Sequence, residues 1–261
     1  MNAVNLHHHD RAALDCALQH IIRDRSLSGG NDMNALGKLR QHIKRKGLRA
    51  TIRVVWRRYV FAHWALLWMK RDLVSPVPPH QLKPCPPLQV KTITVHNTAA
   101  FARHFGDRVN IMEELATEGY TGHMYLDGKG DAVAFIWGST REYHDRHFYG
   151  CKFPVKKGEF FEFGGELARA YWGTTLSVDL QLRLWKAMQA QGCNTVVDVC
   201  DAHNIPALKL HIRMGYQEQG RIQHVYRLFG RWRFFREARY SDSRLDALRK
   251  PSRSPVPEAV A

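Results

Sequence analysis

The fold of this chain is decided by one stretch, residues 160–191, which reads Phe-Phe-Glu-Phe-Gly-Gly-Glu-Leu-Ala-Arg-Ala-Tyr-Trp-Gly-Thr-Thr-Leu-Ser-Val-Asp-Leu-Gln-Leu-Arg-Leu-Trp-Lys-Ala-Met-Gln-Ala-Gln. Its start alternates aromatic and acidic side chains with a period of two, which predicts a β-strand. After small residues at 173–177, apolar residues recur at helical spacing, at Leu176, Leu180, Leu184, Ala187 and Met188. Gly192 follows where a glycine commonly ends a helix. The predicted order is strand, tight turn, helix.

The turn between this strand and this helix has the backbone of an anion site. A helix N-terminus presents N–H groups without helical partners, and phosphates and pyrophosphates are the ligands that use them. A plain connection of small residues between a strand and a helix is an equally good interpretation of the turn alone.

A second motif follows the helix. Residues 195–200, Thr-Val-Val-Asp-Val-Cys, are β-branched and predict a strand, and residues 204–216 read Asn-Ile-Pro-Ala-Leu-Lys-Leu-His-Ile-Arg-Met-Gly-Tyr. This order resembles the GNAT acyltransferase superfamily, whose members carry strand, pyrophosphate turn, helix and strand, then Asn-x-x-Ala/Ser-x-x-Leu-Tyr-x-x-x-Gly-Phe. The matching residues are Asn204, Ala207, Leu210, Gly215 and Tyr216. The resemblance covers roughly residues 88–232.

The resemblance implies an α/β fold with a mixed, mostly antiparallel central sheet flanked by helices. The turn departs from the usual Tyr-Arg-Gly-x-Gly-x-Gly/Ala of the family. Tyr171 and Gly173 match, but Trp172 replaces the arginine, and Thr175 and Ser177 replace glycine or alanine. Threonine and serine are small and add hydroxyl donors, but they lack the freedom of glycine to adopt positive φ.

The resemblance also implies a co-substrate and its binding residues. The co-substrate is acetyl-CoA or another acyl-CoA, and the acyl group passes to an amine acceptor. The implied pyrophosphate site is formed by Trp172, Gly173, Thr174, Thr175, Leu176 and Ser177. Asn204 is predicted to cap the following helix, and the resemblance places it beside the pantetheine arm, between the strand before the turn and the strand at 195–200.

Acyl transfer to an amine needs a base for the acceptor and an acid for the leaving thiolate. Glu162 and Glu166 lie on or just after the predicted strand, where aromatic neighbours raise the pKa of a carboxyl group. Surface carboxylates without a role are the other interpretation. Many family members use a tyrosine as the acid, and here that position holds His211, a residue type that donates protons near neutral pH. A helix histidine without a role is equally open.

Charge and cysteine content limit the function classes. The net charge of +15 comes mainly from residues 33–73, with 11 basic residues against one acid, and from residues 221–240, with six arginines against one acid. Residues 74–220 are neutral, which argues against one basic groove for nucleic acid. Five scattered cysteines without Cys-x-x-Cys favour a reducing compartment and exclude a zinc finger. We therefore expect a cytoplasmic protein without metal or signal peptide.

The chain before the family-like region divides into three parts. Residues 1–32 are predicted to be a polar extension, poorly ordered or a short helix, and Met33 is an alternative translation start. Residues 33–73 are predicted to be a basic, Trp-rich amphipathic helical arm. It lies on an anionic membrane surface, packs on the following domain, or binds nucleic acid, and the residues leave all three interpretations open. Residues 74–87 hold six prolines and are predicted to be a linker.

The acyltransferase-like domain is expected over residues 88–240. It should begin with a strand at 88–95 and a helical segment at 98–118, followed by a hairpin of residues 122–126 and 132–137. Residues 138–158 are expected to be a loop or a strand extension that faces the acceptor. The chain should end in paired strands within 221–235 and a disordered tail at 241–261.

Two function classes therefore follow, with a third beside them. The first is an acyl-CoA-dependent N-acyltransferase, peripheral on the inner face of the cytoplasmic membrane, acting on an amino sugar, a glycan precursor or a lipid amine. The second is a non-catalytic binding or regulatory protein with the same fold. The third is a nucleic-acid-binding protein that uses the basic arm.

Overall fold

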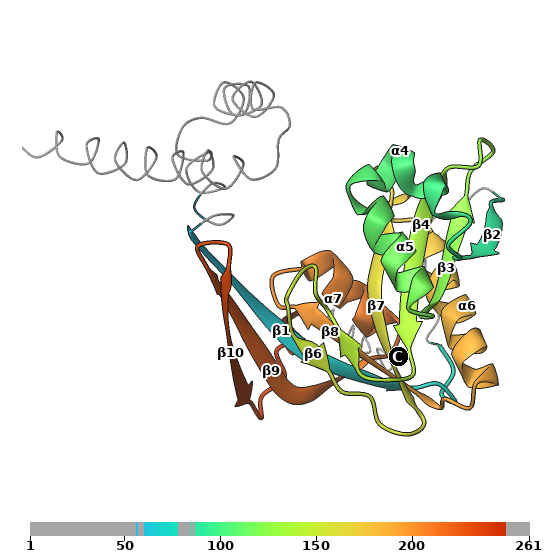
Figure 1. Ribbon diagram of the computed structural model, residues 1–261. Helices are drawn as coiled ribbons and strands as arrows, with labels where there is room; N and C mark the ends of the chain where they lie inside the picture. Colours follow the sequence, from blue (N-terminus) through green and yellow to red (C-terminus); the bar gives the residue numbers. More distant parts are fainter. Residues whose placement is uncertain (1–55, 57–59, 78–83, 85–86, 249–261) are drawn as a thin grey trace, which may run out of the picture. The chain divides into compact units, whose positions relative to one another are not determined.

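The computed structural model describes residues 56, 60–77, 84 and 87–248 (Figure 1). Its main feature is an eight-stranded sheet in the order β10-β9-β1-β8-β7-β4-β3-β2. The strands are β1 Phe61–Asp72, β2 Gln89–Thr92, β3 Thr121–Leu126, β4 Ala132–Ser139, β7 Glu159–Leu167, β8 Thr195–Asp201, β9 Gln217–Leu228 and β10 Trp232–Arg239. Strands β7 and β8 pair in parallel, and the pairs β1–β8, β2–β3, β3–β4 and β4–β7 are antiparallel. The mixed, mostly antiparallel sheet flanked by helices confirms the predicted fold class.

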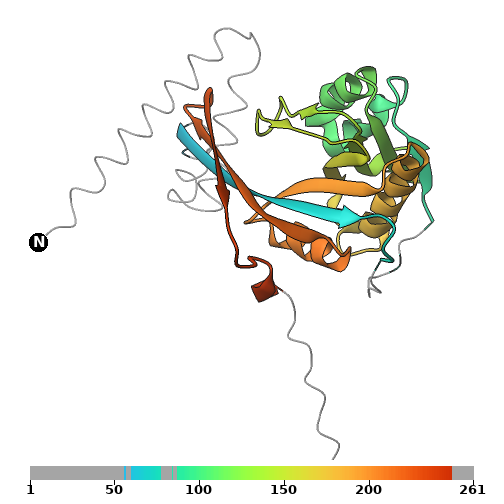
Figure 2. The same cartoon turned by 90° about the horizontal axis from the view of Figure 1, so that it is seen from below.

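Helical segments cover both faces of this sheet (Figure 2). Strand β4 is buried along its whole length and shows which helices lie on which face. On one face, Phe135 meets Phe101 and Phe105 edge to face, with ring centroids 5.3 and 5.0 Å apart. On the other, a Cβ on Gly138 would meet Met188 of α6 at 2.6 Å. The segments on the first face are η2 Thr98–Phe101, α4 Ala102–Phe105, η3 Gly106–Arg108 and α5 Val109–Thr117. The other two helices are α6 Leu176–Ala190, which provides Met188, and α7 Ile205–Arg213.

Most elements predicted from residues 88–235 are present. The hairpin of β3 and β4, the strand–turn–helix of β7 and α6, and the paired strands β9 and β10 are confirmed. Gly192 follows α6 with a φ of +86°, as a glycine that ends a helix does. The helical segment after residue 98 is confirmed but forms four short pieces, and β2 is shorter than the predicted strand at 88–95. The loop at 138–158 carries a small hairpin of β5 Tyr143–His144 and β6 Lys152–Phe153.

The prediction of a helical arm over residues 33–73 is wrong for its last part. Phe61–Asp72 form β1, whose inner half pairs with β8 from Leu66↔Asp201 to Asp72↔Thr195. Residues 65–69 are buried on both strand faces, so they form a continuous apolar run. The periodicity of such a run does not distinguish a strand from a buried helix. Residues 33–55 and 57–59 lie outside the described residues.

The position of β1 also changes the interpretation of the proline-rich segment. The segment at 74–87 connects β1 to β2, two strands of one sheet, so it does not separate an arm from the fold. A domain that started at residue 88 would lack a strand that lies between β9 and β8. The apolar residues of β1 are therefore part of the folded core, and Leu67, for example, is 1% exposed. Trp56, which precedes β1, is 48% exposed.

The predicted disorder of the tail is wrong for residues 241–248. Glu218 accepts hydrogen bonds from the hydroxyl groups of Tyr240 and Ser243, both at 2.7 Å, and from the backbone N–H of Arg244 and Leu245. Leu245 is 1% exposed. Glu218 therefore anchors the start of the tail, whereas residues 249–261 lie outside the described residues.

The chain divides into two compact units, and each is considered by itself. The larger contains residues 65–223 and 237–248 of the described chain, and it holds the elements around β7 and β8. The smaller contains residues 56, 60–64 and 224–236 of the described chain, where His63 Nε2 lies 3.0 Å from His224 Nδ1 and the ring of His63 stacks on Tyr226. No helix within the described residues is long and apolar enough to span a membrane.

Candidate functional site

The site begins where two parallel strands separate. Strands β7 and β8 pair only from Glu159↔Thr195 to Phe161↔Val197. Beyond this point β7 is irregular, with Gly164 at a φ of +66° and a register shift opposite Phe135 and Trp137 of β4. A positive φ suits glycine because it has no Cβ. The next residue on each strand, Glu162 and Asp198, therefore lies at the opening between them.

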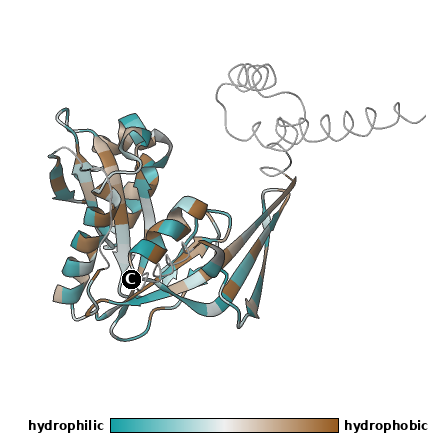
Figure 3. Ribbon diagram, turned by 180° about the vertical axis from the view of Figure 1, so that it is seen from behind, coloured by the Kyte–Doolittle hydropathy of each residue, from teal (hydrophilic) through white to brown (hydrophobic). Residues whose placement is uncertain are grey.

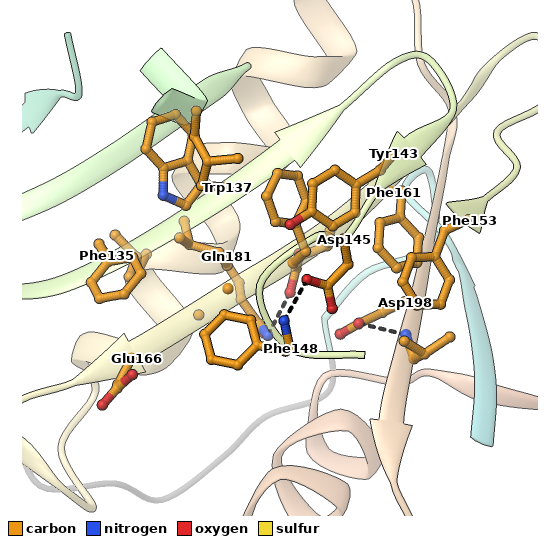
Figure 4. A pocket seen from close by; sticks show the side chains of 18 of the residues that line it. Phe135, Trp137, Tyr143, Asp145, Phe148, Phe153, Phe161, Glu166, Gln181 and Asp198 are labelled. Atoms are coloured by element: carbon orange, nitrogen blue, oxygen red, sulfur yellow. Dashed lines mark hydrogen bonds between the residues drawn. The ribbon is translucent and has the colours of Figure 1, made fainter. Parts of the chain in front are cut away.

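A cavity of about 410 Å³ lies at this opening (Figure 4). Its lining comes from both faces of the sheet. Ser177, Gln181 and His211 come from α6 and α7, whereas Tyr143, Phe148 and Phe153 come from the loop at 138–158. The alternation along β7 explains this, because Phe161 and Phe163 point to the loop while Glu162 points to α6.

Glu162 is buried against α6. Its carboxyl group accepts hydrogen bonds from Gln181 Nε2 at 2.9 Å and from the indole N–H of Trp185 at 2.8 Å. Burial, together with the negative charge of Asp198, raises the pKa of Glu162 to about 8. Glu162 therefore holds a proton at neutral pH and can exchange it near physiological conditions.

His211 forms a buried pair with Asp198. The Nε2–H of His211 donates to Asp198 Oδ2 at 2.6 Å, and its Nδ1–H donates to the carbonyl oxygen of Ala207 at 2.7 Å. Burial alone lowers the pKa of His211, but the hydrogen bond and charge of Asp198 outweigh it and raise this pKa well above its ordinary value. Both ring nitrogens face acceptors, which is the arrangement of a doubly protonated imidazolium.

Two further polar groups near this pair lack hydrogen bonds of normal geometry among the described residues. They are the hydroxyl group of Tyr216 and the Oε1 atom of Gln181, and both side chains are at least 95% buried. Burial and the charges of Glu162 and Asp198 raise the pKa of Tyr216 well above its ordinary value, so the phenol is neutral. A buried acceptor without a partner is costly, and Gln181 lines the cavity, so Gln181 Oε1 is a candidate acceptor for a ligand N–H.

The opposite side of the cavity is aromatic. Tyr143 stacks on Phe163 with centroids 3.7 Å apart, and Phe153 stacks on Phe161 at 4.5 Å. Asp145 holds the adjoining loop, because its carboxylate accepts hydrogen bonds from the backbone N–H groups of residues 147, 148 and 149. This side offers flat apolar surfaces that a ligand can stack on.

Glu166 lies farther along β7, at the edge of the cavity. Its carboxylate forms an ion pair with Arg108, whose guanidinium lies over the ring of Phe148, 5.3 Å from the centroid. The Glu166 side chain is 38% exposed. The two carboxylates predicted as base candidates are therefore in different surroundings, and Glu162 is the one beside Asp198 and His211.

The predicted anion turn leads directly into α6. Thr175 is the N-cap residue, and its side chain accepts no hydrogen bond from the first turn. Trp172 is 67% exposed, and its indole N–H donates to the carbonyl oxygen of Leu167. The first turn of a helix leaves N–H groups without helical partners, but here the N–H of Leu176 donates to Thr174 Oγ1 and that of Val178 to the carbonyl oxygen of Thr175. The N–H of Ser177, which lines the cavity, is therefore the candidate anion donor at this end of α6. Asn204 caps α7 as predicted, since its side chain accepts from the N–H of Ala207 at 3.3 Å.

Only some of the site residues predicted from the sequence line the cavity. Glu162, Glu166, Ser177, Asn204 and His211 line it, whereas five residues of the predicted pyrophosphate turn do not: Trp172, Gly173, Thr174, Thr175 and Leu176. Sequence reasoning missed Asp198, Gln181 and Trp185. The signal for Asp198 was present, because a carboxylate inside a β-branched strand needs a partner when it is buried.

Comparisons with known proteins give similarity in structure only. No protein-family profile matches the sequence, and no curated protein sequence matches it. The solved structures that resemble this chain include acetyltransferases of the GNAT family.

Three of these structures indicate the extent of the similarity. A Drosophila protein is 11% identical with a TM-score of 0.45, and the match covers 70% of this chain and 57% of that protein, so the chain spans little more than half its length. An aminoglycoside N-acetyltransferase in complex with CoA is 17% identical with a TM-score of 0.39, over 50% of this chain and 92% of that one. A ribosomal-protein-alanine N-acetyltransferase from Brucella melitensis is 10% identical with a TM-score of 0.38, and the match covers 49% of this chain and 90% of that protein.

Proposed function

We propose that this protein is an acyl-CoA-dependent N-acyltransferase, with acetyl-CoA as the first co-substrate to test. One observation carries the proposal: β7 and β8 separate directly after Phe161↔Val197, and a cavity at this opening is lined by Glu162, Asp198 and His211. Glu162 and His211 hold exchangeable protons where a thioester would enter between the strands.

The chain has groups that fit the co-substrate. The N-terminus of α6 would hold the pyrophosphate through backbone N–H groups and the positive end of the helix dipole. The buried Oε1 atom of Gln181 would accept an N–H of the pantetheine arm, which carries amide donors. Asn204 stands at the start of α7 beside the same cavity. Acyl-CoA supplies the acyl group in activated form, as a thioester.

Two proton transfers are required of the side chains in the cavity. Ionised Glu162 takes the proton from the acceptor amine as the amine attacks the acyl carbon, so acyl transfer should rise with pH toward about 8. His211 gives a proton to the leaving sulfur as the C–S bond breaks. Both N–H groups of His211 are already bound, so the sulfur must approach the Nε2–H that is shared with Asp198.

The acceptor is an amine whose body is apolar or can stack. The aromatic side of the cavity, formed by Tyr143, Phe153, Phe161 and Phe163, supports this choice. Sugar rings and aromatic rings stack on such faces, and alkyl chains pack on them. An amino sugar, a glycan precursor and a lipid amine are therefore the acceptor classes that we propose.

We also propose that the protein works in the cytoplasm, on the inner face of the cytoplasmic membrane. Residues 33–60 are basic and contain Trp56, a composition that suits an anionic lipid surface. This part of the proposal rests on sequence, since most of these residues lie outside the described part of the chain.

The proposal is tested by calorimetric titration with acetyl-CoA, using Thr175→Asp and Thr175→Ser. Aspartate is at least as good an N-cap as threonine, so Thr175→Asp should keep or raise the melting temperature. It also sets a carboxylate against the pyrophosphate, so it should weaken micromolar binding by at least about tenfold. Thr175→Ser, the matched control, should bind like the wild type.

The possible outcomes separate the function classes. No heat and no thermal shift with any acyl-CoA would contradict the proposal. Binding that is lost in Thr175→Asp, without acyl transfer to any amine in a panel of amino sugars and lipid amines, would instead indicate a non-catalytic binding protein with this fold.

A further inference from the structure

The end of the β9–β10 hairpin exposes an unusual number of aromatic side chains. Phe229, Trp232, Phe234 and Phe235 are 53%, 63%, 53% and 48% exposed. Phe234 and Phe235 are neighbours in β10 and therefore point to opposite faces, so neither face of this strand is covered at that point. Exposed apolar clusters of this kind mark surfaces that bind a partner or a membrane. Figure 3 shows hydrophobic and hydrophilic residues side by side along these strands.

The turn itself provides an independent observation. Leu228 and Arg231 close it through a backbone hydrogen bond of 3.1 Å, and the two central residues, Phe229 and Gly230, have φ values of +49° and +70°. Two positive φ values define a type I′ turn, for which Asn-Gly is the favoured pair. Phe229 is the only non-glycine residue with positive φ among the described residues.

A phenylalanine at this turn position is strained, and it remains 53% exposed. The ring of Phe229 meets Trp232 edge to face, with centroids 6.0 Å apart, and both residues are exposed. The N–H of Phe229 donates to the carbonyl oxygen of Val60 at 2.8 Å. Backbone strain persists where the surrounding structure fixes it, and it clusters at functional sites. Here the strained residue places an aromatic ring at the tip of the hairpin.

The charge of the hairpin selects the partner. Residues 219–236 contain five arginines and no acid. In the smaller unit, Arg231, Arg233 and Arg236 lie next to the exposed aromatic residues in sequence, and Arg231 and Arg236 are exposed. An anionic lipid surface matches this order, because aromatic rings enter the interface while guanidinium groups stay at the phosphates.

We propose that the tip of the β9–β10 hairpin inserts Phe229 and Trp232 into the interface of an anionic membrane, with Arg231 and Arg236 binding lipid phosphates. None of these four residues lines the cavity. Membrane binding requires no acyl transfer, so it can be tested on the protein as it is.

The test is co-sedimentation of the full chain with vesicles. Vesicles of phosphatidylcholine and phosphatidylglycerol should retain the protein at low salt, and phosphatidylcholine alone should not. Phe229→Asn creates the favoured Asn-Gly turn, so it should keep or raise the melting temperature. It should still weaken vesicle binding by about five- to tenfold, because it removes one interfacial ring.

Further variants separate charge from apolar contact. Arg231→Gln with Arg236→Gln should weaken binding and reduce its dependence on salt. Val74→Asn changes another exposed apolar residue, 79% exposed, and should bind vesicles like the wild type.

Three results would overturn the proposal. They are equal recovery with neutral vesicles, binding that the hairpin variants leave unchanged, and no vesicle binding at low salt. Salt-dependent binding to single-stranded nucleic acid in place of vesicles would assign the same aromatic and basic surface to nucleic acid instead.

Discussion

Glu162 and His211 hold their protons more tightly in the folded protein than glutamate and histidine do in water, and the causes differ. For Glu162 the cause is burial beside a second carboxylate, and for His211 it is the partner Asp198, which overcomes burial. In both cases the folded chain binds more protons than the unfolded chain. The free energy of unfolding should therefore fall as pH rises.

The pH range over which Glu162 changes the free energy of unfolding lies between the ordinary glutamate pKa of 4.5 and the raised pKa of about 8. Its stabilising contribution is fully present below pH 4.5 and is lost as pH rises to about 8. Glu162→Gln keeps the shape of the side chain but does not ionise. Compared with the wild type, this variant should therefore gain stability across that pH range, on the order of a few kcal/mol.

Urea denaturation of both proteins between pH 4.5 and 9 measures this difference. Other groups, such as Glu218, whose pKa is lowered by its hydrogen bonds despite burial, affect both proteins alike and cancel. A constant difference between wild type and Glu162→Gln at every pH would show that Glu162 does not hold a proton in the folded protein.

Most helices and strands could be predicted from the local periodicity of apolar residues. The pattern of residues 160–192 correctly predicted β7, the turn and α6. A strand with one exposed end and an amphipathic helix each have a visible periodicity of apolar residues in the sequence. The same reasoning failed for β1. Leu66, Leu67, Trp68 and Met69 are all buried, so no polar face reveals the period of a strand.

The site was only partly predictable for a related reason. The spacing of the second motif located Asn204 and His211, and the alternation of β7 located Glu162. The partners of these residues depend on how distant elements pack. Asp198 lies 13 residues from His211, and Gln181 lies 19 residues from Glu162, and no local pattern joins them.

The placement of β1 leads to a prediction about truncated chains. A chain that starts at residue 88 lacks β1 and leaves the edges of β8 and β9 unpaired. It also lacks Arg71, whose guanidinium is buried and donates to the carbonyl oxygens of Met214 and Ser75. This chain should aggregate or unfold without cooperativity.

A chain that starts at residue 56 keeps all eight strands of the sheet and is the matched control. It should unfold cooperatively, as followed by circular dichroism during heating. If the chain from residue 88 melts as cooperatively and at the same temperature as the chain from residue 56, β1 does not belong to the folded core.

In the whole molecule, the residues that line the cavity and the segments that carry the excess positive charge lie in different parts of the chain. The cavity lies in the larger unit, whose residues 74–220 are neutral. The basic residues gather in the segment before β1 and in the β9–β10 hairpin. A segment without net charge gives no field that favours a polyanion, while basic segments suit an anionic surface. Loss of vesicle binding and loss of acyl-CoA binding should therefore occur in separate sets of variants.

We propose that the opening between β7 and β8 receives the thioester of an acyl-CoA. The most direct measurement is a crystal structure of the protein with acetyl-CoA, read for the position of the thioester sulfur. We expect the sulfur in the cavity, between Glu162 and the Asp198–His211 pair, with the pyrophosphate at the N-terminus of α6. Density for acetyl-CoA outside this opening, or an empty cavity at saturating acetyl-CoA, would contradict it.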